Sequence, residues 1–491
     1  MSVEPVIESP YTVKARCSIT TPVSLFTLRP LFSFLLLVTV TLAAYAGAFR
    51  GDFQFDDVST ILKNPHLDRW DTFAGHLDHM IRPVLYLTFF IDRLLYGNSA
   101  AGYHILNLLL HLGCGLLVYR VLVRTVTERT QHIPLWVAIA FLIHPITTET
   151  VTYVSGRASG LMAFWYLLAL FFYIKATECP CRHLAGRMYY VGAMASFLLS
   201  LASKETAVTF PMALLLWDLV VRRLKGAALR QAFFSYQLPF WFVLLMVGTM
   251  MWGHPRYTYL AQFSLDIRPV WDNVLSQIYT VAYALLLFFA PWKQNLDHDL
   301  LVFHSLTQWP LFLDLMVFGG LAMVATLAAR RLPLITFGLA WFFLQLIPTN
   351  SVIPRLDLLS ERNLYLASIG LLLVVVVIGT CIAERLTMAL RRTRIVQIGM
   401  TTASLALVVL LCLATTARNA LYHDAVLLWS DAIQKSPDKA RPHNNLGHAY
   451  AQQGKWDLAI EEFRIALTLQ PDYPLAQQNL LNAYLRHVDR N

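Results

Sequence analysis

Two adjacent acids, Asp56 and Asp57, stand in the segment FQFDDVSTILKNP, which runs from Phe53 to Pro65. A long apolar run, Leu31 to Phe49, ends just before this segment, so the pair is expected at the mouth of a membrane-spanning helix. Neighbouring carboxylates in that position could take a proton from a hydroxyl group or seat a divalent cation. The simpler interpretation is that both acids only end a helix and face water.

Further charged residues stand in other segments that are expected on the same side of the membrane. They are Arg82, Glu149, Arg157, Lys204, Glu205, Glu361 and Arg362. Acids and cations on one face suit a site that activates a nucleophile and also holds an anion. Each of them also has a simpler interpretation: Lys204 and Glu205 could form a surface ion pair, and Arg362 could anchor a helix with Glu361 as its partner. The phosphate loops GxxxxGK[ST] and GxGxxG do not occur in the sequence.

The composition is that of a multi-pass membrane protein. Of the 491 residues, 57% are hydrophobic and 14% are charged, and the mean hydropathy is +0.52. The net charge of +9 comes from cations in short segments between apolar runs, which indicates cytoplasmic loops rather than nucleic-acid binding. Six cysteines are too few for a disulfide scaffold, and Cys179 with Cys181 offers at most a weak metal or thiol site. The first apolar run has no cleavage pattern and is interpreted as a retained anchor.

Alternation of the basic segments predicts about eleven crossings. Residues 1–30 form a cytoplasmic tail, residues 31–253 hold seven helices with a first outer loop at 50–100, and residues 254–418 hold a variable outer loop and the remaining helices. To keep the charge pattern consistent, the apolar run 274–291 must lie at the outer interface or dip in and out. The polar residues His104, His111 and His144 are expected to pack inside the bundle. The acid pair and the C-terminus are then both extracytoplasmic.

Residues 419–491 form a separate helical tail. In residues 440–473 the spacing of small and aromatic residues, such as Gly447, Tyr450 and Phe463, is that of a 34-residue tetratricopeptide repeat. Half-repeats flank this unit on both sides. So short an α-solenoid is expected to lean on the membrane part or on a partner.

Several short sequences identify a resemblance through their joint order along the chain. These are FDDVSTILKNP, RPVLYLTFFID with GYHILN and LLH, HPITTETVTYVSGR, SKETAVT and ERNLYLASIG, followed by the repeat tail. Together they resemble the transmembrane and tetratricopeptide repeat protein family, which is related to protein O-mannosyltransferases of the GT-C superfamily. The resemblance implies a GT-C helical bundle and a glycosyltransferase that uses a polyprenyl-phosphate sugar, with mannose as the expected sugar and a protein Ser or Thr hydroxyl as the acceptor.

The resemblance also implies site roles. Asp56 is expected to be the catalytic base and Asp57 to orient either Asp56 or the acceptor, while the other charged residues above are expected to bind the donor phosphate or the substrate. No metal is assigned, although a divalent cation at the acid pair stays an alternative. The repeats are expected to dock the acceptor or a partner. The short tail favours a bacterial plasma membrane over the endoplasmic reticulum.

Two other classes of protein fit a polytopic chain with polar residues. A transporter or lipid flippase would place its charged site near the membrane midplane and show repeated halves, whereas these acids lie in loops and the halves look unlike. A non-catalytic scaffold that presents the repeats would leave the clusters at SKE and ERN without a role.

Overall fold

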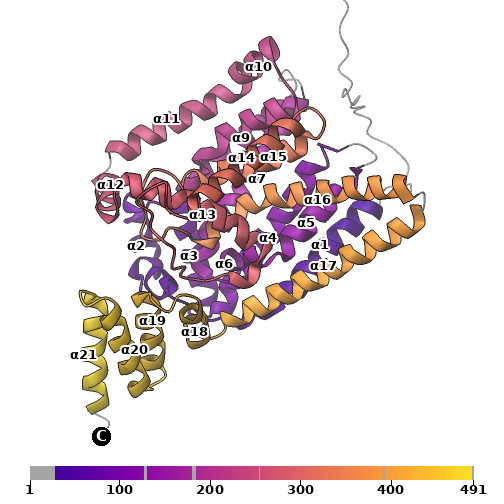
Figure 1. Cartoon of the computed structure of the whole chain (residues 1–491). Helices are drawn as coiled ribbons and strands as arrows, with labels where there is room; N and C mark the ends of the chain where they lie inside the picture. Colours follow the sequence, from indigo (N-terminus) through magenta and orange to yellow (C-terminus); the bar gives the residue numbers. More distant parts are fainter. Residues whose placement is uncertain (1–27, 127–129, 180–183, 254, 391–392, 489–491) are drawn as a thin grey trace, which may run out of the picture.

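The structure is a computed structural model that describes residues 28–126, 130–179, 184–253, 255–390 and 393–488 (Figure 1). Within these ranges every regular element is a helix, which confirms the all-α fold class. Residues 1–27 of the predicted N-terminal tail lie outside the described residues. The same is true of Cys181, one of the two cysteines considered as a weak metal or thiol site.

The described chain is a multi-pass membrane protein, because nine of its helical runs are long and apolar enough to cross a bilayer. They are built on α1 (Leu28–Tyr45), α4 (Ala100–Leu122), α7 (Arg157–Glu178), α8 (Leu184–Ser203), α11 (Leu238–Gly253), α13 (Val270–Phe289), α14 (Leu311–Ala328), α16 (Leu364–Leu390) and α17 (Thr393–Leu421). A helix pair bent by 57°, α5 (Ile133–Ile143) with Pro145–Val151, adds a tenth. The shorter apolar helix α15 (Pro333–Leu346) is a further apolar segment. The set differs from the eleven predicted crossings, because it includes α13, which was not expected to cross, and leaves out the broken run that follows Lys204.

Short helices connect these runs. They are η2 (Ala46–Arg50), η3 (Val58–Leu62), η4 (Pro65–Leu67), α2 (Trp70–Ala74), η5 (Leu77–His79), α3 (Pro83–Tyr96), η7 (Pro145–Thr147), α6 (Thr148–Val151), η8 (Val154–Gly156), η9 (Glu205–Thr209), α9 (Phe210–Leu216), η10 (Trp217–Val221), α10 (Gly226–Ala232), η11 (Phe233–Gln237), α12 (Pro255–Ile267), η12 (Pro291–Lys293) and η13 (Glu361–Asn363). One of the seven helices predicted in residues 31–253 corresponds to η9, α9 and η10, a broken run that begins directly after Lys204.

Helix α13 is the segment whose crossing the charge pattern left open. It is one uninterrupted helix, so the predicted dip in and out of the membrane is wrong. Near its start Asn273 donates to the carbonyl oxygen of Ser351 at 2.8 Å, and at its end Phe288 stacks on His144 with ring centroids 4.7 Å apart. Both contacts are with segments at the end of the bundle that carries Asp56. We therefore keep the outer-interface placement of α13 as our interpretation.

Helices α15 and α16 touch through glycines. A Cβ atom built on Gly338 would lie only 2.5 Å from the carbonyl oxygen of Gly370, and one on Gly370 would lie even closer to the oxygen of Gly338. Only glycine allows two helix backbones to approach this closely. The contact of Gly338 with Gly370 fixes α15 and α16 side by side. The connection between these two helices carries Glu361 and Arg362 of the predicted site residues.

The tail consists of α18 (Ala425–Lys435), α19 (Ala440–Gln452), α20 (Trp456–Leu469) and α21 (Pro474–Val488), the yellow helices at the lower left of Figure 1. Phe463 packs directly on Gly447, where a Cβ atom would lie 2.8 Å from its ring, so the close packing of α19 and α20 requires the glycine. The tail packs on the bundle as well. Trp429 meets Phe55 edge to face at 5.4 Å, directly beside the acid pair.

Candidate active site

A polar cavity of about 330 Å³ lies at the end of the bundle that carries the acid pair. Its charged lining residues come from four separate segments of the chain. They are Asp56, Arg82, Lys204, Arg355, Asp357 and Arg362. Four cations and two acids thus face one space, together with Tyr86, Ser155, Ser360 and Asn363.

Asp56 is the acid of the predicted pair that reaches the cavity. The preceding residue, Phe55, has a φ of +43°, a left-handed conformation that costs a non-glycine residue about 1–3 kcal/mol. The ring of Trp429 packs on Phe55, and the backbone N–H of Asp56 donates to the Tyr153 hydroxyl at 3.0 Å. Within the described residues the carboxylate of Asp56 has no hydrogen bond or ion pair. It is therefore available to a substrate.

Asp57 has the opposite environment, because it is fully buried and does not line the cavity. One carboxylate oxygen accepts from the backbone N–H and the hydroxyl of Ser155, at 2.7 and 2.5 Å, and the other accepts from the N–H of Gln54 at 2.9 Å. Burial raises the pKa of Asp57 to about 7, and these hydrogen bonds only partly oppose the rise. These hydrogen bonds let Asp57 hold the turn that carries Asp56, and its role in orienting Asp56 or the acceptor stays a prediction.

Lys204 lies in the wall of the cavity and is only 5% exposed. Its Nζ donates to Oγ of Ser159 at 2.8 Å and to Oδ1 of Asn363 at 2.9 Å, and the described residues give it no ion pair. Burial lowers the pKa of this ammonium well below its usual range, and the neighbouring Arg82 and Arg362 lower it further. A buried cation with only neutral partners is well suited to an anionic ligand.

Arg82 is held by Glu205 on the neighbouring segment. Two parallel bonds, Nε to Oε2 at 3.0 Å and Nη2 to Oε1 at 2.8 Å, join the two side chains. Burial favours a raised pKa for Glu205, but the charge and hydrogen bonds of Arg82, together with Lys204, lower it to about 2. Arg355 lies 3.9 Å from the same carboxylate. Glu205 thus fixes two arginines of the cavity wall without lining the cavity itself.

Arg362 is held in a similar way by Glu149. The backbone N–H of Arg362 donates to Glu149 at 2.9 Å, and its Nε lies 3.6 Å from the other carboxylate oxygen. The guanidinium also lies over the ring of Tyr153, 5.8 Å from the centroid. Since Tyr153 also binds the backbone of Asp56, one aromatic residue connects the free acid to the cation.

Two predicted residues lie away from the cavity. Arg157 is 1% exposed and pairs with Asp92 at 2.6 Å, beneath the turn that holds Asp57. Glu361 is also buried and binds the segment after α13: it accepts from the backbone N–H of Asn295 at 2.6 Å and from His298 at 2.9 Å. Of the nine predicted residues, the cavity therefore receives Asp56, Arg82, Lys204 and Arg362. Glu149 and Glu205 hold arginines of the cavity and Asp57 holds the turn of Asp56. Arg157 and Glu361 are paired with other segments.

Sequence reasoning missed Arg355 and Asp357 as site residues. Both lie in the irregular segment between α15 and η13, which has no helical or strand pattern to place a side chain. Their charge was a usable signal, because this short segment leads directly into η13, which carries Arg362. The predicted packing role of the histidines fits His111, which is buried and bonds the Tyr365 hydroxyl at 2.8 Å.

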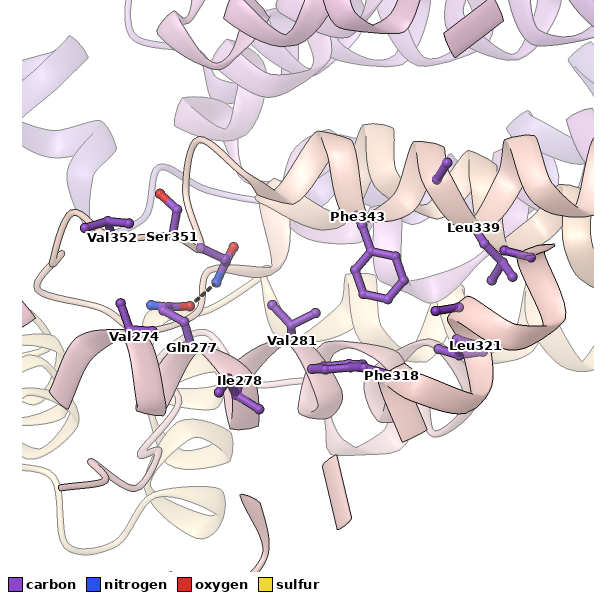
Figure 2. A pocket seen from close by; sticks show the side chains of 14 residues that line it. Val274, Gln277, Ile278, Val281, Phe318, Leu321, Leu339, Phe343, Ser351 and Val352 are labelled. Atoms are coloured by element: carbon purple, nitrogen blue, oxygen red, sulfur yellow. Dashed lines mark hydrogen bonds between the residues drawn. The ribbon is translucent and has the colours of Figure 1, made fainter. Parts of the chain in front are cut away.

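An apolar groove of about 540 Å³ lies beside the polar cavity, between α13, α14 and α15 (Figure 2). Side chains such as Ile278, Phe318 and Phe343 line it. At its polar end Gln277 accepts a 2.8 Å hydrogen bond from Asn350, and Asn350 in turn accepts one from Thr349, which lines the polar cavity. The segment 349–352 thus separates a charged cavity from an apolar groove.

Among the described residues no group of three or more His, Cys, Asp or Glu side chains is arranged to hold a metal ion. Asp56 lines the cavity, whereas Asp57 does not and accepts hydrogen bonds on both of its carboxylate oxygens. The fold and the cavity together define a class: a multi-pass helical membrane protein with a cationic site at its loop end and a short helical repeat tail.

Comparisons with known proteins agree with this class. Residues 440–473 match the tetratricopeptide repeat family. Protein O-mannosyl-transferase F38B6.6 of Caenorhabditis elegans is 22% identical over 90% of this chain, protein O-mannosyl-transferase Tmtc3 of Drosophila melanogaster 26% over 90%, and human protein O-mannosyl-transferase TMTC1 24% over 92%. The predicted resemblance to the transmembrane and tetratricopeptide repeat proteins is thereby confirmed. The chain covers 63%, 56% and 57% of these relatives' lengths. No solved structure matches the chain.

Proposed function

We propose that this protein is a glycosyltransferase that moves a sugar, with mannose expected, from a polyprenyl-phosphate donor to a hydroxyl acceptor. The main support for this proposal is the composition of the cavity. Its wall contains Lys204, three arginines and the carboxylate of Asp56, which has no ion pair among the described residues. The names of the relatives support transfer to proteins, so a Ser or Thr hydroxyl is the proposed acceptor. We place the reaction on the extracytoplasmic side, in a bacterial plasma membrane or the endoplasmic reticulum.

In the proposed reaction Asp56 takes the proton of the acceptor hydroxyl, and the oxygen of that hydroxyl bonds to the anomeric carbon of the sugar. The bond from that carbon to the phosphate oxygen breaks, and the phosphate leaves with the electron pair. Lys204 and the arginines stabilise the charge that develops on the departing phosphate. The GT-C bundle that the resemblance implies is part of the same proposal.

The apolar groove supports a lipid donor. Its side chains offer a place for an isoprenoid chain, and only the segment 349–352 separates it from the cationic cavity. A lipid phosphate could therefore bind with its chain in the groove and its head group among the cations. A transporter site near the membrane midplane fits less well, since the cavity is built from connecting segments at one end of the bundle.

The repeats supply the proposed contact with the acceptor protein or a partner. Helix α18 packs beside the turn that holds Asp56, so a protein bound on the tail would lie close to the cavity. This docking role rests on the general use of such repeats and on their position.

The variant Asp56→Asn tests the proposal in the full-length protein. Turnover of a polyprenyl-phosphate mannose with a Ser- and Thr-containing peptide should fall at least about 100-fold, while the melting temperature stays unchanged. Asp52→Asn is the matched control, because Asp52 is an exposed acid nearby that does not line the cavity. Full turnover in Asp56→Asn would remove the assignment of the base, and equal losses in both variants would indicate a general effect of charge.

A further inference from the structure

Helix α19 of the repeat tail reaches the wall of the cavity through one arginine. Arg441 binds Asp297 through two bonds, Nε to Oδ2 at 2.6 Å and Nη2 to Oδ1 at 2.5 Å, and the same Nη2 lies 2.5 Å from Asp357. Asp297 is almost completely buried, whereas the side chain of Asp357 is 39% exposed. The arginine therefore has one fixed anchor and one partner that faces the cavity.

Asp357 is poorly placed for a site that must hold an anion. It lines the same cavity as Arg355, two residues before it, and its charge interacts with that of Arg362. A carboxylate among guanidinium groups competes with a phosphate for the same donors, since both anions accept paired N–H bonds from arginine. In the structure Asp357 is bound by Arg441 rather than by an arginine of the cavity. Arg355 and Arg362 are paired with Glu205 and Glu149.

We propose that Arg441 is a positioning residue through which the docked repeat tail keeps the cavity open to anions. When Arg441 holds Asp357, the cations of the cavity are available to a phosphate group. When α19 moves away or loses this arginine, Asp357 pairs with Arg355 or Arg362 and occupies the anion site from within. The tail is then a control element for the site as well as a docking platform.

The contacts around Arg441 explain why the tail stays in place while one pair is tested. Lys439 also binds Asp297, at 2.5 Å, and the Ser436 hydroxyl bonds to the backbone N–H of Asp299 at 3.1 Å. Trp429 packs on Phe55 independently of these polar contacts. Replacement of Arg441 alone therefore leaves α19 docked and Asp297 still paired with Lys439. Asp357 loses its 2.5 Å partner and keeps only Lys439, at 3.9 Å.

The experiment measures binding of farnesyl phosphate, a lipid monophosphate probe, to the full-length protein in detergent by calorimetry. Arg441→Ala should weaken binding about tenfold, which corresponds to about 1.4 kcal/mol. Asp357→Asn should bind at least as tightly as the wild type. The double variant Arg441→Ala with Asp357→Asn should regain wild-type affinity, because no carboxylate remains to compete.

Lys439→Ala is the matched control for net charge. It removes the same charge two residues away and, at Asp357, only a 3.9 Å contact, while Arg441 still binds Asp357 at 2.5 Å. The loss of affinity should therefore stay below about threefold. Wild-type affinity in Arg441→Ala, no recovery in the double variant, or an equal loss in Lys439→Ala would each overturn the proposal.

This inference rests on the proposed function only in that the cavity binds a lipid phosphate. If the wild type does not bind the probe, both proposals fall. If the four variants bind as expected but no sugar is transferred, the inference stands and the proposed transferase activity fails.

Discussion

Two of the regions in which the described part of the bundle buries charged residues lie at opposite ends of the run from Glu205 to Val221. At its far end the fully buried Asp218 accepts from Tyr173 and Gln237, each at 2.7 Å, and from Arg222 at 2.8 Å. At its near end Lys204 lies among other cations and bonds only to neutral side chains. The first cluster is complete without a ligand, and the second is not.

We interpret this difference as one between structural charge and the charge that we propose for ligand binding. A buried carboxylate with three donors stabilises the helices that supply them, and loss of one member leaves the others unpaired. A buried ammonium without a carboxylate costs desolvation energy, and a protein keeps such a group where a ligand will supply the missing charge. The same contrast holds for the two neighbours Asp57 and Asp56. Variants at both ends can sharpen or break the comparison.

The largest effect on stability is expected at Asp218. Asp218→Ala should lower the free energy of unfolding by about 3–5 kcal/mol, because Arg222, Tyr173 and Gln237 lose their shared acceptor inside the bundle. Sugar transfer per folded molecule should not change. Thermal denaturation in detergent and turnover of the surviving fraction measure the two quantities. A stable Asp218→Ala protein with reduced turnover would reverse the comparison.

A second effect depends on pH and comes from Asp57. Because burial raises its pKa from 3.8 to about 7, the folded protein holds the proton more tightly than the unfolded chain. Stability from this group is therefore present below about pH 4 and is lost as the pH rises to 7, by up to about 4 kcal/mol. Melting temperatures across this range should fall less steeply in Asp57→Asn, which cannot ionise. Equal slopes in both proteins would show that Asp57 is already ionised.

The smallest change in stability is expected at Lys204. Lys204→Met should leave the free energy of unfolding within about 1 kcal/mol, since the lost hydrogen bonds are offset by removal of a buried charge. Binding of farnesyl phosphate should nevertheless weaken about tenfold or more. Calorimetry and thermal denaturation on the same sample test this pair of results. A strongly destabilised variant with normal binding would make Lys204 a structural residue like Asp218.

Much of the architecture could be predicted because it follows local rules. Apolar runs of about twenty residues located most spans, and the spacing of small and aromatic residues located the repeat at 440–473. Helix α13 was harder, because its 20 residues fit a span while both of its ends contact segments at one end of the bundle. Length and hydropathy alone do not separate these two arrangements.

The site was predictable in its residue types but less so in its contacts. The sequence placed Asp56, Lys204 and Arg362 on one side, and the structure brings them into one cavity. The sequence could not show that Arg157 forms an ion pair with Asp92, 65 residues away. It also could not show that Glu361 binds His298 in the segment after α13, 63 residues away. Burial and pairing over such distances are properties of the folded chain alone.

The contact between Gly338 and Gly370 has a mechanical consequence. Gly338 lies eight residues, or about 12 Å, from the end of α15 at Leu346, and Gly370 lies six residues, or about 9 Å, from the start of α16 at Leu364. These two helix ends lead into the connection that carries Arg355 and Arg362. Because the two backbones already touch here, α15 and α16 cannot move closer together at this point. A change in the angle between the two helices would therefore be a rotation about the contact of Gly338 with Gly370. A small rotation at this contact would then change the distance of Arg355 and Arg362 from the opposite wall of the cavity.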